Sequence, residues 1–581
     1  MTFLHFHLEP LQGPGSVGVS KDPLVSLPPE IVLKILDFSP VSTVAALTCS
    51  SRAWHAFIDR THRDHIYSNI FKTEHSPSTT EPSLYHHEVQ SFSKYYENTS
   101  SWKELCKKQT FLRRNWASEA PTTTESIFTI RREPVWRFRP DFKRRFIIST
   151  SQFGGLEVTC MDTGRQLWAL SRDVVRPYAH LEYDDIDGRG TAVWDRNGDS
   201  LEIWRTTKED GGERGAFEQI AVLHHDCETR GYQLSLNTLC VVSSQGQGFV
   251  YDMLQKPPQL VTHVKMENNA VGHLYQDHDC VLYSLGTKGF HVHSKITGEY
   301  LGAIEPWKCS PHQFYYIDHP DLDSSENNQD SLALASAVQT MRESEPTVFP
   351  PRWPSTSRSV PLSIQPGVRS FLGQDLDDMR DQQLDALQDD DWGAGKICGN
   401  LMVGVSRGGR VIIVRNWRDC LSGLIEDDRT KAAEALARSA VIIQCAPHDD
   451  PRNFDLGGWL SVRNGRILVE VRDQVYILGL NADGLPATGE QAHERPSYAV
   501  SKSATARLGS AVPVSFMALY DDCVMYTYAV VGMHEDAEDH HGNPYSRLFL
   551  TKAVRVLSFA PSRKADAAIP RRRSPGSPAG A

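Results

Sequence analysis

The chain has 581 residues, of which 40% are hydrophobic, and a formal net charge of −11. This length and composition predict a globular protein with a large core and more than one domain. Apolar runs stay shorter than the ~20 residues that cross a bilayer, and the N-terminal sequence lacks the basic start and long apolar core of a signal peptide. We therefore expect a protein of the cytoplasm or nucleus with no membrane partner.

The distribution of charges and cysteines argues against a nucleic-acid-binding protein, a disulfide-rich protein and a zinc-ribbon protein. Between Asp375 and Asp391, eight aspartates and one arginine give a local charge of −7, which accounts for most of the net charge. The remainder is nearly neutral, so no basic stripe predicts a nucleic-acid partner. The eleven cysteines include no Cys-x-x-Cys pair, which argues against a disulfide framework and a zinc ribbon. We expect no metal and no cofactor.

Residues 27–58 predict two short helices, too small to form a domain alone, whose apolar faces a partner must cover. Leu27-Pro28-Pro29-Glu30 suits a helix start, since proline there forfeits no hydrogen bond and glutamate favours the positive end of the dipole. Ser39-Pro40 ends this helix, and Ser42 or Thr43 is expected to cap the next. The apolar positions are Ile31, Val32, Ile35, Leu36, Phe38, Val44, Leu47 and Trp54.

This stretch resembles an F-box, whose members read roughly Leu-Pro-x-Glu, an Ile/Leu helix, a Leu-rich helix and Ser-Arg-x-Trp-His. The residues that match are Leu27, Pro28, Glu30, Ile35, Leu36, Val44, Leu47, Ser51, Arg52, Trp54 and His55. The resemblance implies docking on the Skp-type adaptor of a cullin-based SCF ubiquitin ligase. Together with the apolar phase, it assigns adaptor contact to Leu27, Pro28, Ile31, Ile35, Val44, Leu47 and Trp54.

A helix is expected between the F-box and the rest of the chain. Ser101 and Glu104 have the spacing of a capping box, in which serine caps the helix and glutamate follows three residues later. The sequence from Trp102 to Trp116 resembles the connector helix of F-box proteins with a WD-repeat domain, in which rigidity fixes the distance from adaptor to substrate. A generic amphipathic helix is the alternative.

The C-terminal part contains seven apolar hairpins, each a β-rich run, a turn and a second β-rich run. The first apolar residues of their second strands are separated by 45, 48, 41, 121, 64 and 79 residues. Propeller blades repeat every ~40–45 residues. The hairpins lie at 145–162, 191–206, 239–253, 280–294, 401–415, 466–478 and 523–559.

Two inserts explain two of the three longer steps between hairpins. Removing the 76 acidic, serine- and proline-rich residues 321–396 from the step of 121 leaves 45, and removing the 22 residues 419–440, which include an Ala-rich helical run, from the step of 64 leaves 42. Because little sequence follows Phe559, we expect Ser126–Ile130 to supply the outer strand of the last blade. A closed ring of this kind leaves no sheet edge between its first and last blades.

The predicted fold class is thus multidomain, with a small all-α F-box and an all-β seven-bladed propeller. Turns at Thr163-Gly164 and Thr297-Gly298 resemble those of divergent WD-type and quinoprotein-type propellers. The expected parts are a disordered N-terminus (1–22), the F-box (23–71), a linker with the connector helix (72–125), the propeller (126–560) with a disordered acidic insertion (321–396), and a disordered tail (561–581).

The sequence contains no Gly-x-Ser-x-Gly elbow, no phosphate-binding glycine loop and no His-Glu-x-x-His motif. His291 and His293 share one side of a strand but have no evident third ligand. We therefore expect a non-catalytic subunit of a ubiquitin ligase that recognises a protein substrate. Two alternatives stay open: an F-box scaffold acting outside the ligase, and a quinoprotein-like enzyme.

Overall fold

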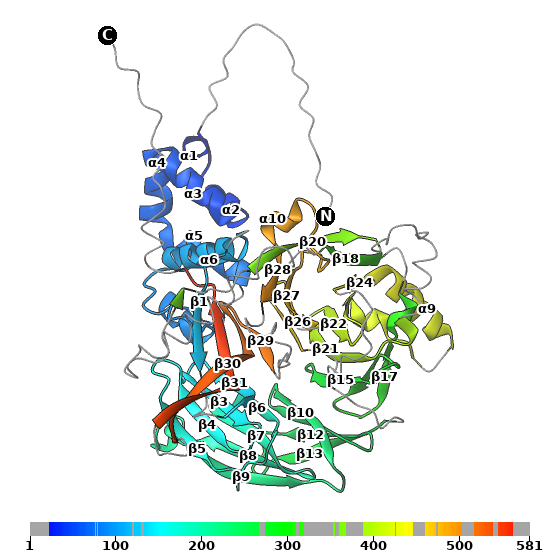
Figure 1. The fold of residues 1–581 in the computed structure, drawn as a ribbon. Helices are drawn as coiled ribbons and strands as arrows, with labels where there is room; N and C mark the ends of the chain where they lie inside the picture. The colour runs from blue at the N-terminus through cyan, green and yellow to red at the C-terminus, as the bar shows by residue number, and fades with distance from the viewer. Residues whose placement is uncertain are drawn as a thin grey trace, which may run out of the picture. The chain divides into compact units, whose positions relative to one another are not determined.

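The computed structural model describes most of the chain as two compact units (Figure 1). The first unit comprises residues up to Glu88 together with Tyr96–Thr110, and the second comprises Val89–Tyr95 and residues from Phe111 onward. No helix among the described residues is long and apolar enough to span a bilayer. The described ranges are 22–75, 77, 79–118, 121–128, 133–266, 273–309, 313–318, 353–354, 359–367, 387–423, 426–445, 459–471, 474–501, 516–538 and 544–561.

The first unit is helical. Its core is formed by apolar side chains of α2, α3 and α5, among them Val32, Leu36, Val44, Ile66 and Phe71, which are all nearly inaccessible to solvent. The elements are α1 (Pro23–Ser26), α2 (Pro29–Asp37), α3 (Val41–Ser50), α4 (Arg52–His55), the π-helix η1 (Ala56–Thr61), α5 (Arg63–His75), the 3-10 helix η2 (Pro82–His87) and the first part of α6 (Trp102–Trp116).

Two local predictions for this unit need correction. The second helix begins at Val41, with Pro40 as its N-cap residue and no side-chain capping bond, so neither Ser42 nor Thr43 caps it. The boundary expected at residue 71 falls inside α5, which continues to His75 because Ile70 and Phe71 pack into the core. The ring of Phe71 also contacts Tyr85 and Trp102, at centroid distances of 4.9 and 5.7 Å.

The capping box expected at Ser101 is confirmed in its first half. Ser101 Oγ accepts a hydrogen bond from the backbone N–H of Glu104 at 3.3 Å. The return bond differs from the expected one, because Glu104 accepts from the backbone N–H of Ser100 at 3.0 Å rather than from that of Ser101. Either way the carboxylate holds a backbone donor at the positive end of α6.

The second unit is a β-propeller domain built from antiparallel four-stranded groups that follow one another in chain order (Figure 1). The first groups are β2–β5 (Val135–Asp141, Phe146–Ser151, Leu156–Cys160, Gln166–Leu170) and β6–β9 (Leu181–Ile186, Arg189–Asn197, Ser200–Thr206, Phe217–His224). Next come β10–β13 (Thr229–Ser235, Thr238–Ser243, Gln247–Asp252, Gln259–Lys265) and β14–β17 (Leu274–Gln276, Cys280–Ser284, Phe290–Ser294, Tyr300–Ile304).

Two further groups share a ten-stranded sheet, and the last group lies in a five-stranded sheet. The shared sheet holds β21–β24 (Trp392–Cys398, Leu401–Ser406, Arg410–Arg415, Ala440–Gln444) and β25–β28 (Leu460–Arg463, Arg466–Val471, Gln474–Gly479, Ser497–Ser501). The last group comprises β29 (Met517–Leu519), β30 (Cys523–Glu538), β31 (Pro544–Ser558) and β1 (Thr124–Phe128).

All seven predicted hairpins are present as paired central strands of these groups. The turn glycines Gly164 and Gly298 have φ of 66° and 75°, a conformation that side chains with a Cβ rarely adopt. The propeller prediction is thereby confirmed. The count of seven separate blades stays a prediction, because β18 (Phe314–Asp318) and β20 (Ser359–Pro366) join two groups into one sheet.

The closing strand predicted before the first hairpin is confirmed. β1 pairs antiparallel with β31 from Thr124 opposite Ser558 to Phe128 opposite Val554. It begins two residues earlier than Ser126, and Ile130 lies outside the described residues. A buried ion pair between Glu125 and Arg555 joins the same two strands.

The predicted insertion 321–396 is not disordered throughout. β20 pairs with β18 on one side and with β28 on the other, while β18 pairs in parallel with β24. Leu362 and Ile364 are buried in this sheet because alternate residues of a strand point to the same side. β19 (Trp353–Pro354) lies along β1, and β21 begins at Trp392. The acidic run up to residue 386, like most of 1–22 and 561–581, lies outside the described residues.

The helical insert predicted at 419–440 contains α9 (Glu426–Ser439), preceded by the 3-10 helix η6 (Trp417–Cys420). Leu436 of α9 packs into the same apolar cluster as Trp417. The predicted end is one residue late, because Ala440 is the first residue of β24.

Residues 89–95, which precede the propeller by sequence, are bound to its last four-stranded group. The buried Asp522 carboxylate accepts hydrogen bonds from Ser91 Oγ at 2.7 Å, from the backbone N–H groups of Phe92 and Ser93 at 2.8 and 2.9 Å, and from Ser93 Oγ. Arg145 donates to the carbonyl oxygen of Phe92 at 2.9 Å. We refer to residues 89–95 as the clamp segment.

The I364A substitution should lower the free energy of unfolding by about 2 to 4 kcal/mol, since it removes a buried side chain between two four-stranded groups. Hydrogen–deuterium exchange of the full chain should become faster in β24 and β28. Ser363 lies on the exposed side of the same strand, so S363A serves as the matched control. Equal exchange in the two variants would contradict a structural role for β20.

The D522N substitution should destabilise the propeller by about 3 kcal/mol, because one acceptor oxygen is replaced by an amide that faces existing donors. Thermal unfolding of the full chain is the measurement, and exchange at residues 89–95 should increase in parallel. D173N at an exposed position is the control. Unchanged protection of residues 89–95 would show that another contact holds the clamp segment.

Candidate functional site

The first unit carries a row of exposed apolar side chains on α1, α2 and the turns beside them. In a soluble protein, neighbouring exposed apolar side chains mark a surface that a partner covers. We call this set the F-box surface, and its members, with their exposed fractions, are Val25 (84%), Leu27 (36%), Ile31 (49%), Ile35 (51%) and Phe38 (81%).

Helix periodicity separates this surface from the core. Ile31, Ile35 and Phe38 are spaced by four and three residues and therefore share one side of the α2 region. Val32 and Leu36 lie about a third of a turn away, on the side that faces the core, and each is only 1% exposed. The ammonium group of Lys34 lies 5.3 Å from the centre of the Phe38 ring and leaves that ring largely open to solvent.

The predicted adaptor-binding residues fall into two groups. Leu27, Pro28, Ile31 and Ile35 are exposed, and Leu47 is partly exposed. Val44 and Trp54 are buried, at 0% and 8% exposure, so they are placed to support the surface rather than to form it. Sequence reasoning did not assign Val25 and Phe38 to the site, although Phe38, three residues after Ile35, continues the helical side that Ile31 and Ile35 share.

Trp54 is held in the core by local structure. Its backbone N–H donates to Ser51 Oγ at 3.1 Å, which makes Ser51 the N-cap of α4. The indole contacts the Phe57 ring edge-on at a centroid distance of 6.3 Å. Asp59, at the next turn, pairs with Lys103 of α6 at 2.6 Å. The Ser-Arg-x-Trp-His pattern thus begins α4 and buries Trp54 in the core of the helical unit.

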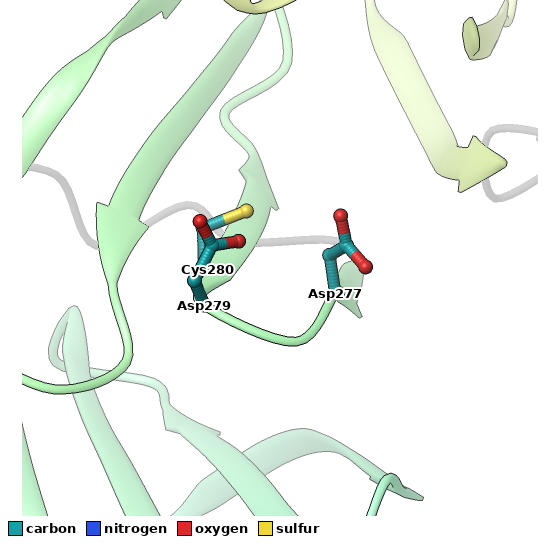
Figure 2. Close-up of side chains that lie close together, drawn as sticks. All are labelled: Asp277, Asp279 and Cys280. Carbon is teal, nitrogen blue, oxygen red and sulfur yellow. The ribbon is translucent and has the colours of Figure 1, made fainter. Parts of the chain in front are cut away.

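One acidic cluster in the propeller has metal-ligand spacing. Figure 2 shows Asp277, Asp279 and Cys280 around one turn, with potential ligand atoms within 4.8 Å of one another. Arg418 already donates to both carboxylates, at 3.2 and 2.8 Å. Burial raises the pKa of the Cys280 thiol to about 12, which keeps it protonated and a poor ligand. We interpret the cluster as an ion-paired link between β15 and η6.

The two histidines noted in the sequence pack around one tyrosine. His291 and His293 both lie on β16, and each ring is 5.4 Å from that of Tyr300 on β17. His293 Nδ1 is 3.3 Å from the carbonyl oxygen of Gly298, and burial lowers its pKa. These contacts account for both rings without a metal.

Comparison with known protein families identifies the residues of the F-box. Residues 24–65 match the F-box domain family. No curated protein sequence matches the chain. Similar solved structures include BamB from Moraxella catarrhalis (10% identity, TM-score 0.35, covering 73% of this chain and 96% of that one). Others are Saccharomyces cerevisiae Sqt1 (7%, 0.39, 74% and 88%) and the RRP9 WD40 repeats (9%, 0.37, 75% and 97%).

The chain therefore carries an F-box domain at residues 24–65, followed by the β-propeller domain that the strand order defines. F-box domains bind Skp-type adaptors, and F-box plus propeller is an architecture of SCF substrate receptors. The F-box resemblance noted in the sequence is confirmed.

The W54A substitution should destabilise the F-box by about 3 to 5 kcal/mol, because it empties a buried aromatic position. Hydrogen exchange across residues 23–75 of the full chain should increase strongly. I35A removes a half-exposed apolar side chain from the same unit and should change stability by less than about 0.5 kcal/mol. Similar exchange in both variants would contradict the division into core and surface.

Proposed function

We propose that this protein is a substrate-recognition subunit of a cullin-based SCF ubiquitin ligase. The F-box surface docks on the Skp-type adaptor, and the propeller binds a protein substrate. The chain itself contributes no catalytic group to ubiquitin transfer. It acts in the cytoplasm or nucleus by raising the effective concentration of a target lysine near the ubiquitin-charged enzyme that other subunits bring.

One observation carries the adaptor half of this proposal. Five apolar side chains of the matched F-box region and its edge remain solvent-exposed while their helical neighbours fill the core. Removing each of them from water on docking favours binding by about 25 cal/mol per Å² of apolar area. We assign the central contacts to Ile31 and Ile35, which lie midway along the surface, with Leu27, Pro28 and Phe38 around them.

The substrate half rests on architecture. Propeller domains present loops from several sheets on each face, and such loops carry binding specificity on a rigid scaffold. The buried cores of successive four-stranded groups, represented by Trp194 and Trp417, supply that rigidity here.

The alternative is an F-box scaffold that binds the adaptor but acts outside the ligase. Both proposals require the same F-box surface, so adaptor binding alone does not separate them. The two proposals differ in cullin binding. A ligase subunit binds the cullin through the adaptor, whereas the scaffold binds the adaptor without the cullin.

The test is affinity purification of the full chain and of the I31D/I35D double variant from cells. Central interface anchors often exceed 2 kcal/mol, or about thirtyfold in affinity each, so the double variant should lose most of the adaptor. Adaptor and cullin should both be recovered with the natural sequence. Recovery of adaptor without cullin would favour the scaffold.

The matched control is I296D, which places the same charge at a 78% exposed isoleucine of the propeller. It should retain adaptor and cullin at the level of the natural sequence. Undiminished adaptor capture by the I31D/I35D variant, with hydrogen exchange confirming that its helices are intact, would overturn the assignment of the F-box surface.

A further inference from the structure

The propeller encloses a central cavity of about 380 Å³. Its walls come from the innermost strands of successive groups, β2, β6, β10, β14, β21, β25 and β29. Cationic and aromatic side chains predominate among the polar and large residues of the lining. Those used below are Arg137, Arg139, Lys396, Tyr275, Trp459 and Phe516.

Two arginines of β2 point into this cavity. Arg137 and Arg139 are two residues apart, so they lie on the same side of the strand. The guanidinium of Arg137 is stacked between Trp136 and Trp459, at 4.7 and 4.2 Å from the ring centres, and that of Arg139 lies 4.0 Å from the ring centre of Phe516. Stacking of this kind fixes the planes and leaves the N–H edges as donors.

One donor of each arginine has no acceptor among the described residues. The Nη1 atoms of both Arg137 and Arg139 are buried without a hydrogen-bond partner there, and Arg137 as a whole is only 5% exposed. A buried donor of a charged group left without an acceptor costs folding free energy. Both arginines also line the cavity, where an oxyanion would compensate their charges.

The charges around the cavity do not balance. Arg139 pairs with Glu182, and Arg463 pairs with Asp521 at 2.7 Å. No ion pair joins Arg137 or Lys396 to any carboxylate in the described part of the chain, and the ammonium group of Lys396 lies 5.5 Å from the ring centre of Tyr275. Two positive charges are therefore uncompensated, which matches one doubly charged oxyanion.

We propose that the central cavity binds a small molecule in which a doubly charged oxyanion, of the phosphate class, is attached to an aromatic or other flat apolar body. The oxyanion contacts Arg137, Arg139 and Lys396, and the body packs against Tyr275, Trp459 and Phe516. The cavity volume lies in the range of ~300–1,000 Å³ that is typical of small-molecule sites. This site does not depend on adaptor binding.

A free small molecule fits the site better than a side chain of a protein substrate. The cavity volume of about 380 Å³ suits a small molecule rather than a segment of folded chain. Phosphate and arginine form charge-assisted, bidentate hydrogen bonds, which are among the stronger polar contacts in proteins. Enclosure between aromatic rings strengthens them further, because the local dielectric is low.

The protonation of these groups supports an anion site. Burial and the neighbouring Arg139 lower the pKa of Arg137 to about 9, and burial together with Arg463 and Arg139 lowers the pKa of Lys396 to about 8. Burial and the charge of Arg137 hold the pKa of His180 well below its usual value, so that ring is neutral. An anion between the cations would raise the pKa of both Arg137 and Lys396 again.

The test uses isothermal titration calorimetry of the purified full chain with phenyl phosphate, inorganic phosphate and phenol. Phenyl phosphate should bind saturably and raise the melting temperature, inorganic phosphate should bind more weakly, and phenol should bind least because it lacks the charge. R137M and K396M should each weaken phenyl phosphate binding at least tenfold. R172M, at a 65% exposed arginine side chain, should leave it unchanged.

The pH profile tests Lys396 separately. Lys396 is faced by Arg139 from β2, Glu182 from β6, Tyr275 from β14 and Arg463 from β25. Affinity should rise up to pH ~7, as the phosphate loses its second proton near pH 6. It should fall above about pH 8, where free Lys396 becomes neutral. K396M should keep the first step and move the fall upward to about pH 9, where Arg137 becomes neutral.

Three outcomes would overturn the proposal. The first is no binding of phenyl phosphate at millimolar concentration to a chain whose melting curve shows it folded. The second is binding that neither R137M nor K396M weakens. The third is binding of a phosphorylated peptide by the natural sequence while phenyl phosphate fails, which would make the cavity part of the protein-substrate site. If R137M does not fold, K396M and the pH profile decide alone.

Discussion

β1 and β31 come from opposite ends of the propeller sequence, and their pairing closes the ring of sheets. More than four hundred residues separate the two strands, so the pairing has to overcome the closure entropy of the whole domain. That entropy grows only with the logarithm of loop length, which makes one long-range pairing thermodynamically acceptable. The pairing also makes the domain rich in contacts between residues far apart in sequence, and domains of this kind fold slowly. The Glu125–Arg555 pair adds a charge contact to this seam, where both side chains are buried.

The clamp segment and the insertion strands support the same closure from different sides. The clamp segment binds the last four-stranded group through Asp521 and Asp522, and Arg145 of the first group donates to its carbonyl oxygens. β18 and β20 cover the outer edges of β24 and β28, and β19 lies along β1. Exposed edges are templates for unwanted strand pairing. β18, β19 and β20 each cover a strand edge that would otherwise be exposed, and the clamp segment links the first and last groups.

Much of the fold could be predicted because its signals are local. A β-rich run, a glycine turn and a second run identify a hairpin without any tertiary information, and the residue spacing then indicates the repeat. β20 was missed because the composition around it is acidic and proline-rich, although Val360, Leu362 and Ile364 alternate with exposed residues as a strand requires. The F-box surface was predicted only in part. Val44 and Trp54 are as apolar as Ile31 and Ile35, and only packing shows which pair faces inward.

The cavity could not be predicted from spacing, because its cations come from strands far apart in the sequence. Ring closure brings them together. It sets β2 between β6 and the last group, so that Arg139 contacts Phe516 while Arg137 contacts Trp459, the residue before β25. The like charges of these cations repel one another and so oppose ring closure, and their burial adds a desolvation cost to the free energy of folding. The contacts of β18, β19, β20 and the clamp segment therefore also offset this repulsion. They hold together a ring whose centre gathers Arg137, Arg139 and Lys396, whose like charges repel one another.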